Sequence, residues 1–329
     1  MGPRLLAKEV QRVRASLRIG SAEAQPGTKA QGHLHIAYHA DGHPIQMPVI
    51  VVNGKRDGPV LSVVAGIHGD EYDSMIAASR FARELDPQEL KGAIIDIPIV
   101  NTPAFDASSR VSPIDNLNLN RIFPGKKDGF ITERIAYTLT NEVICKSQCF
   151  IDMHGGGNML GIGPLASLEG DGEEALMLAK AWGLELIWKA GPGKGFSTAA
   201  ALENGVRASL AEIGGESRYS EDSVKTFLSG LRNIMKYLGL IESEPKFRQK
   251  YILGDGDFIS CNTGGFYIAE RKVRDFVKKG DRIGRIHDIF GKETETVSAP
   301  IDGVILSIRT YPKVNPGDWV FCIGKVTEI

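Results

Sequence analysis

The chain has 329 residues and is almost electrically balanced, because 39 lysines and arginines face 40 acidic residues and the formal net charge is -1. This balance gives no global electrostatic reason to bind nucleic acid or an anionic membrane. Hydrophobic residues make up 42% and charged residues 24% of the chain, which is typical of a globular protein and excludes a disordered, collagen-like or coiled-coil chain. At this length we expect two domains.

The sequence carries no sign of membrane insertion, export or disulfide bonding. No run approaches the roughly 18 uninterrupted apolar residues of a membrane helix. The first twenty residues scatter basic side chains among apolar ones and have no cleavage site, so we expect a cytoplasmic protein. Four cysteines are too few and too irregular for a disulfide framework or a zinc knuckle, and we interpret Cys145 and Cys149 as small core hydrophobes.

The first half of the chain alternates strands and helices. Two apolar runs, 47–53 and 60–66, flank the turn GKRDGP and predict two strands joined by a hairpin-type loop. The helical spacing from Met75 to Leu85, ended by Pro87, predicts a helix after the loop GIHGDEYD. A strand at 93–100, a helix at 131–143 and a strand at 149–154 follow. This alternation predicts an α/β fold.

The second half begins in the same way and then changes. Helical spacing at 172–182, strands at 185–188 and 207–213, and an amphipathic helix over 224–238 closed by Gly239 complete the α/β pattern. Beyond residue 243, short β segments alternate with the turns GDG, KKGD, PIDG and NPGD. We therefore divide the chain into an N-terminal β-rich extension (1–45), a main α/β domain (46–242) and a C-terminal β domain (243–329).

The C-terminal β domain resembles the barrel-sandwich module of biotinyl and lipoyl carriers in its segments VSAPIDGVILSI and NPGDWVFCIG. A carrier needs a modifiable lysine at a hairpin tip. Lys292 lacks the flanking methionines of a biotin site, so we expect a structural β domain rather than a swinging arm.

Four chemically active side chains follow the predicted strands of the α/β domain. His68 and Glu71 lie three residues apart just past the strand that ends at Ala65, His154 ends the strand at 149–154, and Glu212 lies near the end of a further strand. Ligands of open α/β sheets bind outside the carboxyl ends of the strands. A His/Glu/His set there is of the type that holds catalytic zinc with one position open for water.

The spacing of His68 and Glu71 alone is weak evidence for a metal site, because a His and a Glu beside a glycine turn are more often solvated loop residues. The convergence of several strand ends strengthens the hypothesis. The helical HExxH motif is absent, since position 72 is Tyr.

Four segments together resemble the succinylglutamate desuccinylase/aspartoacylase family, which is related to the zinc carboxypeptidases. They are GIHGDEYD, NTPAFDASSRVSPIDNLNLNRIFPG, IDMHGGG and AEIGGE. The resemblance covers about residues 45 to 240, and the β tail is similar to that of the bacterial predicted-deacylase branch. It implies a zinc-carboxypeptidase-like mixed sheet flanked by helices, followed by the smaller barrel-sandwich-like β domain.

The resemblance also implies roles for individual residues. It makes 46–242 a zinc-dependent catalytic domain that holds one Zn2+ per chain, with a general base that first deprotonates the zinc-bound water and then protonates the leaving amine. An arginine polarises the scissile carbonyl and an Asn–Arg pair grips the substrate carboxylate. The matching residues are His68, Glu71 and His154 for the metal, Glu212 for the base, Arg110 for the carbonyl, and Asn120 with Arg121 for the carboxylate.

Several nearby features keep more than one interpretation. The family often has an acidic residue where this chain has Asn118, so the turn that holds Asn120 is supported differently. Asp152 either orients a ligand histidine or is a buried structural acid. His33 and His35 fit an exposed polar strand face better than a second metal site, and residues 191–198 are expected to form a flexible loop near the pocket.

The sequence therefore predicts a zinc-dependent amidohydrolase that removes a small acyl group from the nitrogen of an amino acid or a related carboxylate-bearing amine. A metallo-carboxypeptidase acting on short peptides is the alternative within the same chemistry. A metal-dependent binding protein without turnover is the alternative from another class. The expected partner is a small N-acylated, amino-acid-like substrate, and a homo-oligomer is the default assembly.

Overall fold

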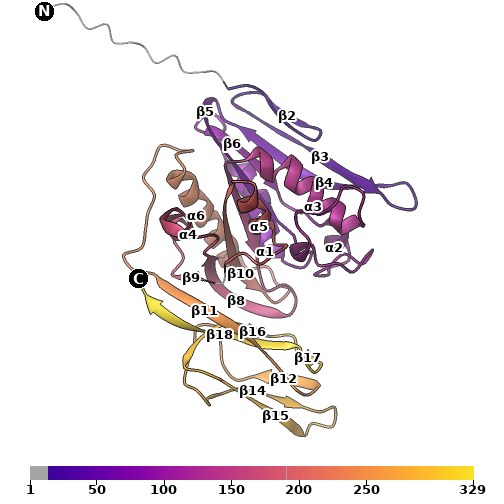
Figure 1. The fold of residues 1–329 in the computed structure, drawn as a ribbon, viewed down its shortest axis with the longest axis vertical. Coiled ribbons are helices and arrows are strands. Elements are labelled where there is room, and N and C mark those ends of the chain that lie inside the picture. Colours follow the sequence, from indigo (N-terminus) through magenta and orange to yellow (C-terminus); the bar gives the residue numbers. More distant parts are fainter. Residues whose placement is uncertain (1–13, 190) are drawn as a thin grey trace, which may run out of the picture.

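The computed structural model describes residues 14–189 and 191–329 and is dominated by one twelve-stranded mixed sheet (Figure 1). The order of its strands is β13-β16-β18-β11-β9-β8-β10-β7-β5-β6-β4-β3. Four neighbouring strands at the centre run parallel, and they are β10 (Arg207–Gly215), β7 (Cys149–His154), β5 (Arg56–Ala65) and β6 (Lys91–Ile97). Their carboxyl ends therefore lie along a single edge of the sheet.

Helices cover both faces of this parallel centre (Figure 1). One face packs on α1 (Tyr72–Glu84), α4 (Gly172–Ala181) and α6 (Glu221–Tyr237). The opposite face packs on α3 (Ile131–Glu142) and α5 (Ser197–Glu203). Because both faces of the sheet are buried here, apolar residues follow one another along β5 and β7 and do not alternate with polar ones. The predicted mixed sheet flanked by helices is confirmed.

The longest helix of the described residues, α6, has the apolar spacing and the terminal glycine from which a helix was predicted here. Its buried side chains include Val224, Phe227 and Leu231, which repeat at helical spacing along one face. Ser220 caps the amino end by accepting a hydrogen bond from the Ser223 amide at 3.2 Å. Gly239, at φ +73°, lies just beyond the last turn, where a left-handed residue ends helices well.

The expected hairpin between the first two strands is wrong. Both strands form, as β4 (Pro44–Asn53) and β5, but β6 lies between them and pairs antiparallel with β4 and parallel with β5. The apolar run of β5 suits an interior strand with a parallel neighbour on each side, whereas a hairpin would have placed it directly against β4. The turn GKRDGP therefore joins two strands that are not neighbours.

The described N-terminal residues are β-rich. They form a small hairpin, β1 (Leu17–Ile19) with β2 (Ala22–Ala24), and the long edge strand β3 (Thr28–Tyr38). His33 and His35 are exposed on β3, as the polar-face interpretation predicts. The features noted in residues 1–13 lie outside the described residues.

Several short elements complete the main domain. Sequence reasoning missed β8 (Leu160–Ser167), α2 (Thr102–Asp106) and α5, which begins inside the segment expected to be a flexible loop. It located β9 (Leu186–Trp188) correctly. Two 3-10 turns, Leu119–Arg121 and Ile144–Lys146, lie beside α3.

The C-terminal strands extend the large sheet and add a second, smaller one. The strand β11 (Ile252–Ser260) pairs with β9 on one side and with β18 (Trp319–Glu328) on the other, so the sheet runs without a break into the C-terminal region (Figure 1). Next come β16 (Gly303–Arg309) and β13 (Phe276–Val277), and β16 also pairs with β8. The four-stranded sheet contains β15 (Glu293–Ser298), β14 (Arg282–His287), β12 (Gly265–Ala269) and β17 (Lys313–Val314).

A separate apolar cluster, including Tyr267, Ile286 and Phe321, fills the space between these C-terminal strands. The expected smaller β unit is therefore present. Lys292 is exposed in the hairpin between β14 and β15.

Two further expectations concern the cysteines and membranes. All four cysteines are free, but only Cys149 of the proposed core pair is buried; Cys145 is exposed because it lies in the short turn before β7. Among the described residues, no helix is long and apolar enough to cross a membrane.

Candidate metal centre and active site

The loop that carries His68 and Glu71 is held rigidly against its neighbours. Gly66 adopts φ +70°, which turns the chain out of β5. Its carbonyl accepts a hydrogen bond from the Asn101 amide at 2.9 Å. A Cβ atom on Gly69 would lie 2.1 Å from the carbonyl carbon of Ala104, so the loop packs directly on the backbone of α2. The side chains of this loop therefore start from a fixed backbone.

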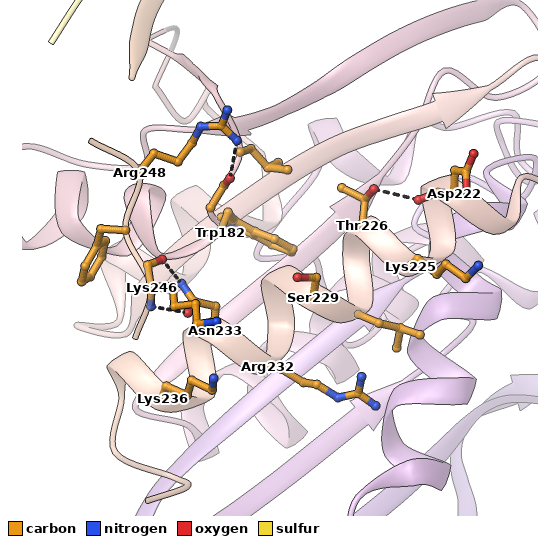
Figure 2. Close-up of a pocket in the computed structure, with 14 residues that line it drawn as sticks. Trp182, Asp222, Lys225, Thr226, Ser229, Arg232, Asn233, Lys236, Lys246 and Arg248 are labelled. Carbon is orange, nitrogen blue, oxygen red and sulfur yellow. Dashed lines mark hydrogen bonds between the residues drawn. The ribbon is translucent and has the colours of Figure 1, made fainter. Parts of the chain in front are cut away.

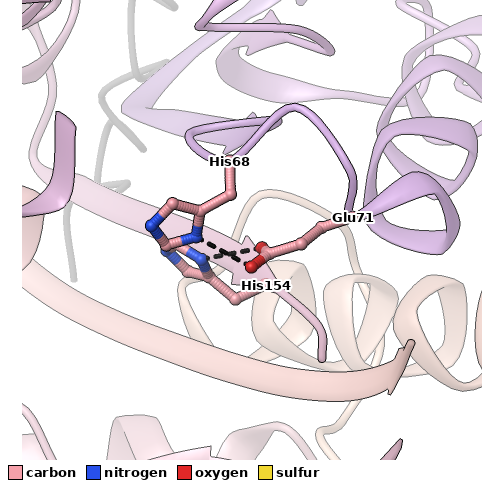
Figure 3. A group of neighbouring side chains, drawn as sticks. All are labelled: His68, Glu71 and His154. Carbon is pink, nitrogen blue, oxygen red and sulfur yellow. Dashed lines mark hydrogen bonds and ion pairs between the residues drawn. The ribbon is translucent and has the colours of Figure 1, made fainter. Parts of the chain in front are cut away.

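Two histidines share the carboxylate of Glu71 at the edge where β5 and β7 end (Figure 3). The Nδ1 atom of His68 lies 2.7 Å from Oε1 of Glu71, and the Nδ1 atom of His154 lies 2.9 Å from Oε2. All three side chains are buried, and their ligand atoms lie within 4.8 Å of one another. The predicted convergence of these residues is present in the fold.

The remaining ring nitrogens face oxygen atoms on the other side of each imidazole. His68 Nε2 lies 3.2 Å from Oδ1 of Asn118, and His154 Nε2 lies 3.0 Å from Oδ2 of Asp152. These oxygens accept hydrogen bonds, so each Nε2 carries a hydrogen, and each Nδ1, the atom that would bind a metal, faces the centre. Of the two interpretations of Asp152, the orienting one agrees with this contact.

The electrostatics of the cluster suit a cation. Burial opposes ionisation of Glu71, but the two imidazoles outweigh it and hold its pKa below the usual range. Burial, together with the positive Arg110, lowers the pKa of His68 to about 4. Burial also disfavours a charged His154, yet Asp152 and Glu71 raise its pKa above the usual value. Two imidazole nitrogens and one carboxylate form a donor set that fits a catalytic zinc ion.

Glu212 lies on the strand next to His154. The two residues are directly paired between the parallel strands β10 and β7. The Oε2 atom of Glu212 is buried and has no hydrogen-bond partner among the described residues. Burial raises the pKa of this carboxyl to about 8. A carboxylate with a free oxygen and a high proton affinity is suited to act as a general base.

Arg110 contacts Glu71, whereas Asn120 lies beside His154. The Arg110 guanidinium donates to Oε1 of Glu71 at 3.2 Å, and Arg110 lines a cavity of about 290 Å³ together with Glu212. The buried Asn120 accepts a hydrogen bond from the Ser197 amide at 2.9 Å, and its Nδ2 lies 3.5 Å from His154 Nε2. Arg121 is exposed, with its guanidinium carbon 4.4 Å from the centroid of the Phe196 ring.

Two groups of nearby residues escaped the sequence analysis. Ser197, the first residue of α5, hydrogen-bonds to Asp152 Oδ2 and supports the acid behind His154. Its helical segment STAAALE was the signal that could have revealed α5. Phe258 and Trp319 line the cavity beside Glu212, although they belong to the C-terminal strands. No motif marks either aromatic residue.

A larger groove of about 840 Å³ lies on α6 and is lined by basic and other polar side chains and by apolar ones such as Trp182 and Phe247 (Figure 2). Several of its groups are already engaged with one another: Asn233 is hydrogen-bonded to the Lys246 backbone, and the Arg248 guanidinium contacts the Gly183 carbonyl at 3.4 Å. The residues that line it include none of the candidate site residues. The groove is therefore separate from the candidate active site.

Comparison with known proteins agrees with this geometry. Residues 57–238, more than half of the chain, match the family model of the succinylglutamate desuccinylase/aspartoacylase catalytic domain. The chain belongs to this family. A relative from Halomonas elongata, N-alpha-acetyl-L-2,4-diaminobutyric acid deacetylase, is 31% identical over 303 residues, which cover 86% of this chain and 87% of the relative.

Solved structures of the desuccinylase/aspartoacylase family also match the complete fold. A succinylglutamate desuccinylase from a Silicibacter species superposes with a TM-score of 0.85 at 25% identity and covers 97% of this chain and 100% of its own. The product-bound structure of an ectoine utilization protein from Ruegeria pomeroyi gives a TM-score of 0.83 at 25% identity and covers 92% of this chain and 96% of its own. The similarity thus includes the C-terminal strands as well as the catalytic sheet.

Proposed function

We propose that this protein is a zinc-dependent hydrolase that removes an acyl group from the nitrogen of an amino acid or a related carboxylate-bearing amine. Membership of the desuccinylase/aspartoacylase family and the deacetylase from Halomonas support amino-acid N-deacylation. The observation that carries the proposal is the buried cluster of His68, Glu71 and His154. At the neighbouring strand end, one carboxylate oxygen of Glu212 has no hydrogen-bond partner among the described residues.

The metal would be held by Nδ1 of His68, Nδ1 of His154 and the carboxylate of Glu71, with one zinc per chain. Bound there, zinc would supply a water of lowered pKa and positive charge beside the scissile carbonyl. Asn118 and Asp152 hold the two rings in the tautomer that leaves the ligand nitrogens free.

Two residues near the cluster would transfer the proton and stabilise the charge that develops on the carbonyl oxygen. Glu212 accepts the proton of the attacking water and returns it to the leaving nitrogen when the tetrahedral intermediate collapses. Arg110, which shares the cavity with Glu212, donates hydrogen bonds to the carbonyl oxygen as negative charge develops on it. A fixed guanidinium suits this role because it keeps its charge throughout the reaction.

Asn120 and Arg121 would hold the carboxylate of the amine half. The planar guanidinium of Arg121 stacks on Phe196 and donates through Nη1 to the Asn120 carbonyl at 2.7 Å, which restricts its motion; its remaining N–H groups would bind the carboxylate. The Asn120 side chain is fixed by the Ser197 amide. Together they would set the distance between the carboxylate and the scissile amide.

Replacing Glu212 by Gln separates an enzyme from a binding protein. We expect a fall of about a thousandfold in kcat for release of amine from an N-acetyl amino acid, with zinc content unchanged, because only the proton transfer is removed. The matched control is Glu216→Gln, at the end of the same strand, which should retain activity. Substrate binding without turnover in the unaltered protein would instead identify a binding protein, and efficient cleavage of long peptides would favour a carboxypeptidase.

A further inference from the structure

The cavity beside Glu212 and Arg110 is bounded in part by the C-terminal strands. Phe258 of β11 and Trp319 of β18 line it, and Met159 lines it from the loop before β8. The volume is about 290 Å³. An acetyl group has only three heavy atoms, and a water takes up roughly 30 Å³ in the liquid, so the cavity is far larger than an acetyl group requires.

The position of the cavity indicates which half of a substrate it receives, given the proposed function. Neither Asn120 nor Arg121 is among the residues that line it, so the proposed carboxylate clamp lies outside it. Glu212 and Arg110, which act on the scissile amide, form part of its wall. With the amine half held by the clamp, the acyl half extends past Arg110 into the cavity.

The charges of the cavity oppose an acyl group that ends in a carboxylate. Arg309 is buried, and its guanidinium donates to the carbonyls of Tyr311, Trp319 and Lys313 at 2.8–3.1 Å and to Asp318 at 3.3 Å. The guanidinium of Arg309 is therefore already hydrogen-bonded within the C-terminal β region.

Besides Glu212, two carboxylates line the same cavity. Asp318 is partly exposed, and the buried Asp70 has one oxygen, Oδ1, without a hydrogen-bond partner among the described residues. Arg110 is the remaining cation of the wall, and it already contacts Glu71 at 3.2 Å. Because Asp318 and Arg309 are paired with each other, an anionic acyl tail would meet the carboxyl groups of Asp70 and Glu212 and would find no free cation among the residues that line this cavity.

The aromatic wall suits apolar atoms. Trp319 stacks on Phe258 with ring centroids 4.4 Å apart and an interplanar angle of 26°, and Phe258 in turn lies 6.0 Å from the ring of Trp188. Trp319 and Met159 each keep 44% of their surface exposed. A chain of methylene groups that covers these surfaces removes apolar area from water, which favours binding in proportion to chain length.

We propose that this cavity is an acyl subsite that selects neutral acyl groups longer than acetyl and rejects dicarboxylic ones such as succinyl, with Trp319 as its principal wall. The C-terminal β strands thereby set the acyl specificity of a reaction that the catalytic sheet performs. This assignment rests on the proposed function.

The test is a panel of acetyl, butanoyl and succinyl derivatives of one amino acid, assayed with the zinc-loaded protein by release of free amine. We expect kcat/KM to rise by about fourfold for each added methylene, or about fifteenfold from acetyl to butanoyl. We expect the succinyl derivative to react more slowly than the acetyl derivative. Equal or lower kcat/KM for butanoyl, or rapid turnover of the succinyl derivative, would overturn the proposal while leaving the deacylase function intact.

Variants of Trp319 test whether the aromatic wall causes the preference for longer acyl groups. Trp319→Ala should reduce the butanoyl-to-acetyl ratio of kcat/KM by about tenfold, and Trp319→Phe should restore most of it. The matched control is Phe276→Ala, which removes another exposed aromatic side chain of the C-terminal region outside the cavity and should leave the ratio unchanged. An unchanged ratio in Trp319→Ala would contradict the assignment. Release of amine from no member of the panel would contradict both the proposed function and the subsite.

Discussion

Two buried carboxylates in neighbouring regions, Glu71 at the carboxyl edge of the central strands and Asp96 within β6, have opposite surroundings. At the edge, Glu71 is surrounded by His68, His154, Arg110 and the Gly155 amide, and its pKa is held low. Within β6, Asp96 is completely buried, neither of its oxygens has a hydrogen-bond partner among the described residues, and burial raises its pKa far above the usual value. The surroundings favour the charged form of Glu71 and the neutral form of Asp96.

This difference reflects what surrounds each position. Loops leave the strand ends and bring imidazoles, a guanidinium and backbone amides to Glu71, so a charge is stabilised there before any ligand binds. Asp96 lies in a strand whose neighbouring residues belong to the two large apolar clusters, and it has no hydrogen-bond partner among the described residues, so a charge there would be uncompensated. Glu71 is therefore available as a ligand for a cation, whereas we expect Asp96 to influence stability.

The largest expected effect is the loss of the edge acid. Glu71→Ala removes one ligand and the group that both imidazoles face, so bound zinc should fall from about one per chain to background and amine release by on the order of a thousandfold or more. Metal analysis and an N-acetyl amino acid assay measure both. Glu89→Ala, which removes an exposed glutamate elsewhere, is the control. Full zinc content in Glu71→Ala would show that the cluster is not the metal site.

A smaller effect is expected at Asp152, which contacts the proposed ligand His154. Asp152→Asn keeps an oxygen near His154 Nε2 but removes its charge, so the dissociation constant for zinc should rise by about 10- to 100-fold. Competition with a chelator measures this constant. Ser197→Ala, which deletes only the hydroxyl that supports Asp152, should shift it less. A lower melting temperature with an unchanged dissociation constant would indicate that Asp152 is only structural.

The smallest effect concerns Asp96 and tests the other half of the comparison. Because its folded pKa is raised above the unfolded value of 3.8, the folded state holds a proton that the unfolded state loses, and stability falls as the pH rises above about 4 toward the folded pKa. The limiting slope is about 1.4 kcal/mol per pH unit for one group. Asp96→Asn should therefore gain stability relative to the unaltered protein as the pH increases.

Urea unfolding at several pH values, with the same zinc content in both proteins, measures this difference. A stability difference between the two proteins that stays constant with pH would show that Asp96 is ionised in the fold, or paired with a group that balances it.

The sequence was informative where function depends on strand ends and short motifs. The sequence predicted that His68, Glu71 and His154 converge. Each lies at or just beyond the end of a strand with a continuous apolar pattern, and the carboxyl ends of parallel strands share one edge of the sheet. The order of the strands was less accessible. Inserting β6 between β4 and β5 depends on pairing between distant residues, and the local turn GKRDGP suggested a hairpin instead.

The outer wall of the site could not be predicted for a related reason. Phe258 and Trp319 stack on each other across 61 positions of sequence and reach the site only because β11 and β18 continue the large sheet. Asp70 lies within a recognised motif, yet its unpartnered oxygen depends on how the loop at Asn158 folds against it. Such features depend on tertiary packing, for which the local sequence has no signature.

The most direct test of the account is the metal content of protein purified without added metal, combined with amine release from N-acyl amino acids before chelation, after chelation and after zinc is returned. The account predicts about one zinc per chain and amine release that is lost on chelation and restored by zinc. A protein that binds no zinc even after reconstitution, or one whose activity is insensitive to chelation, would contradict it.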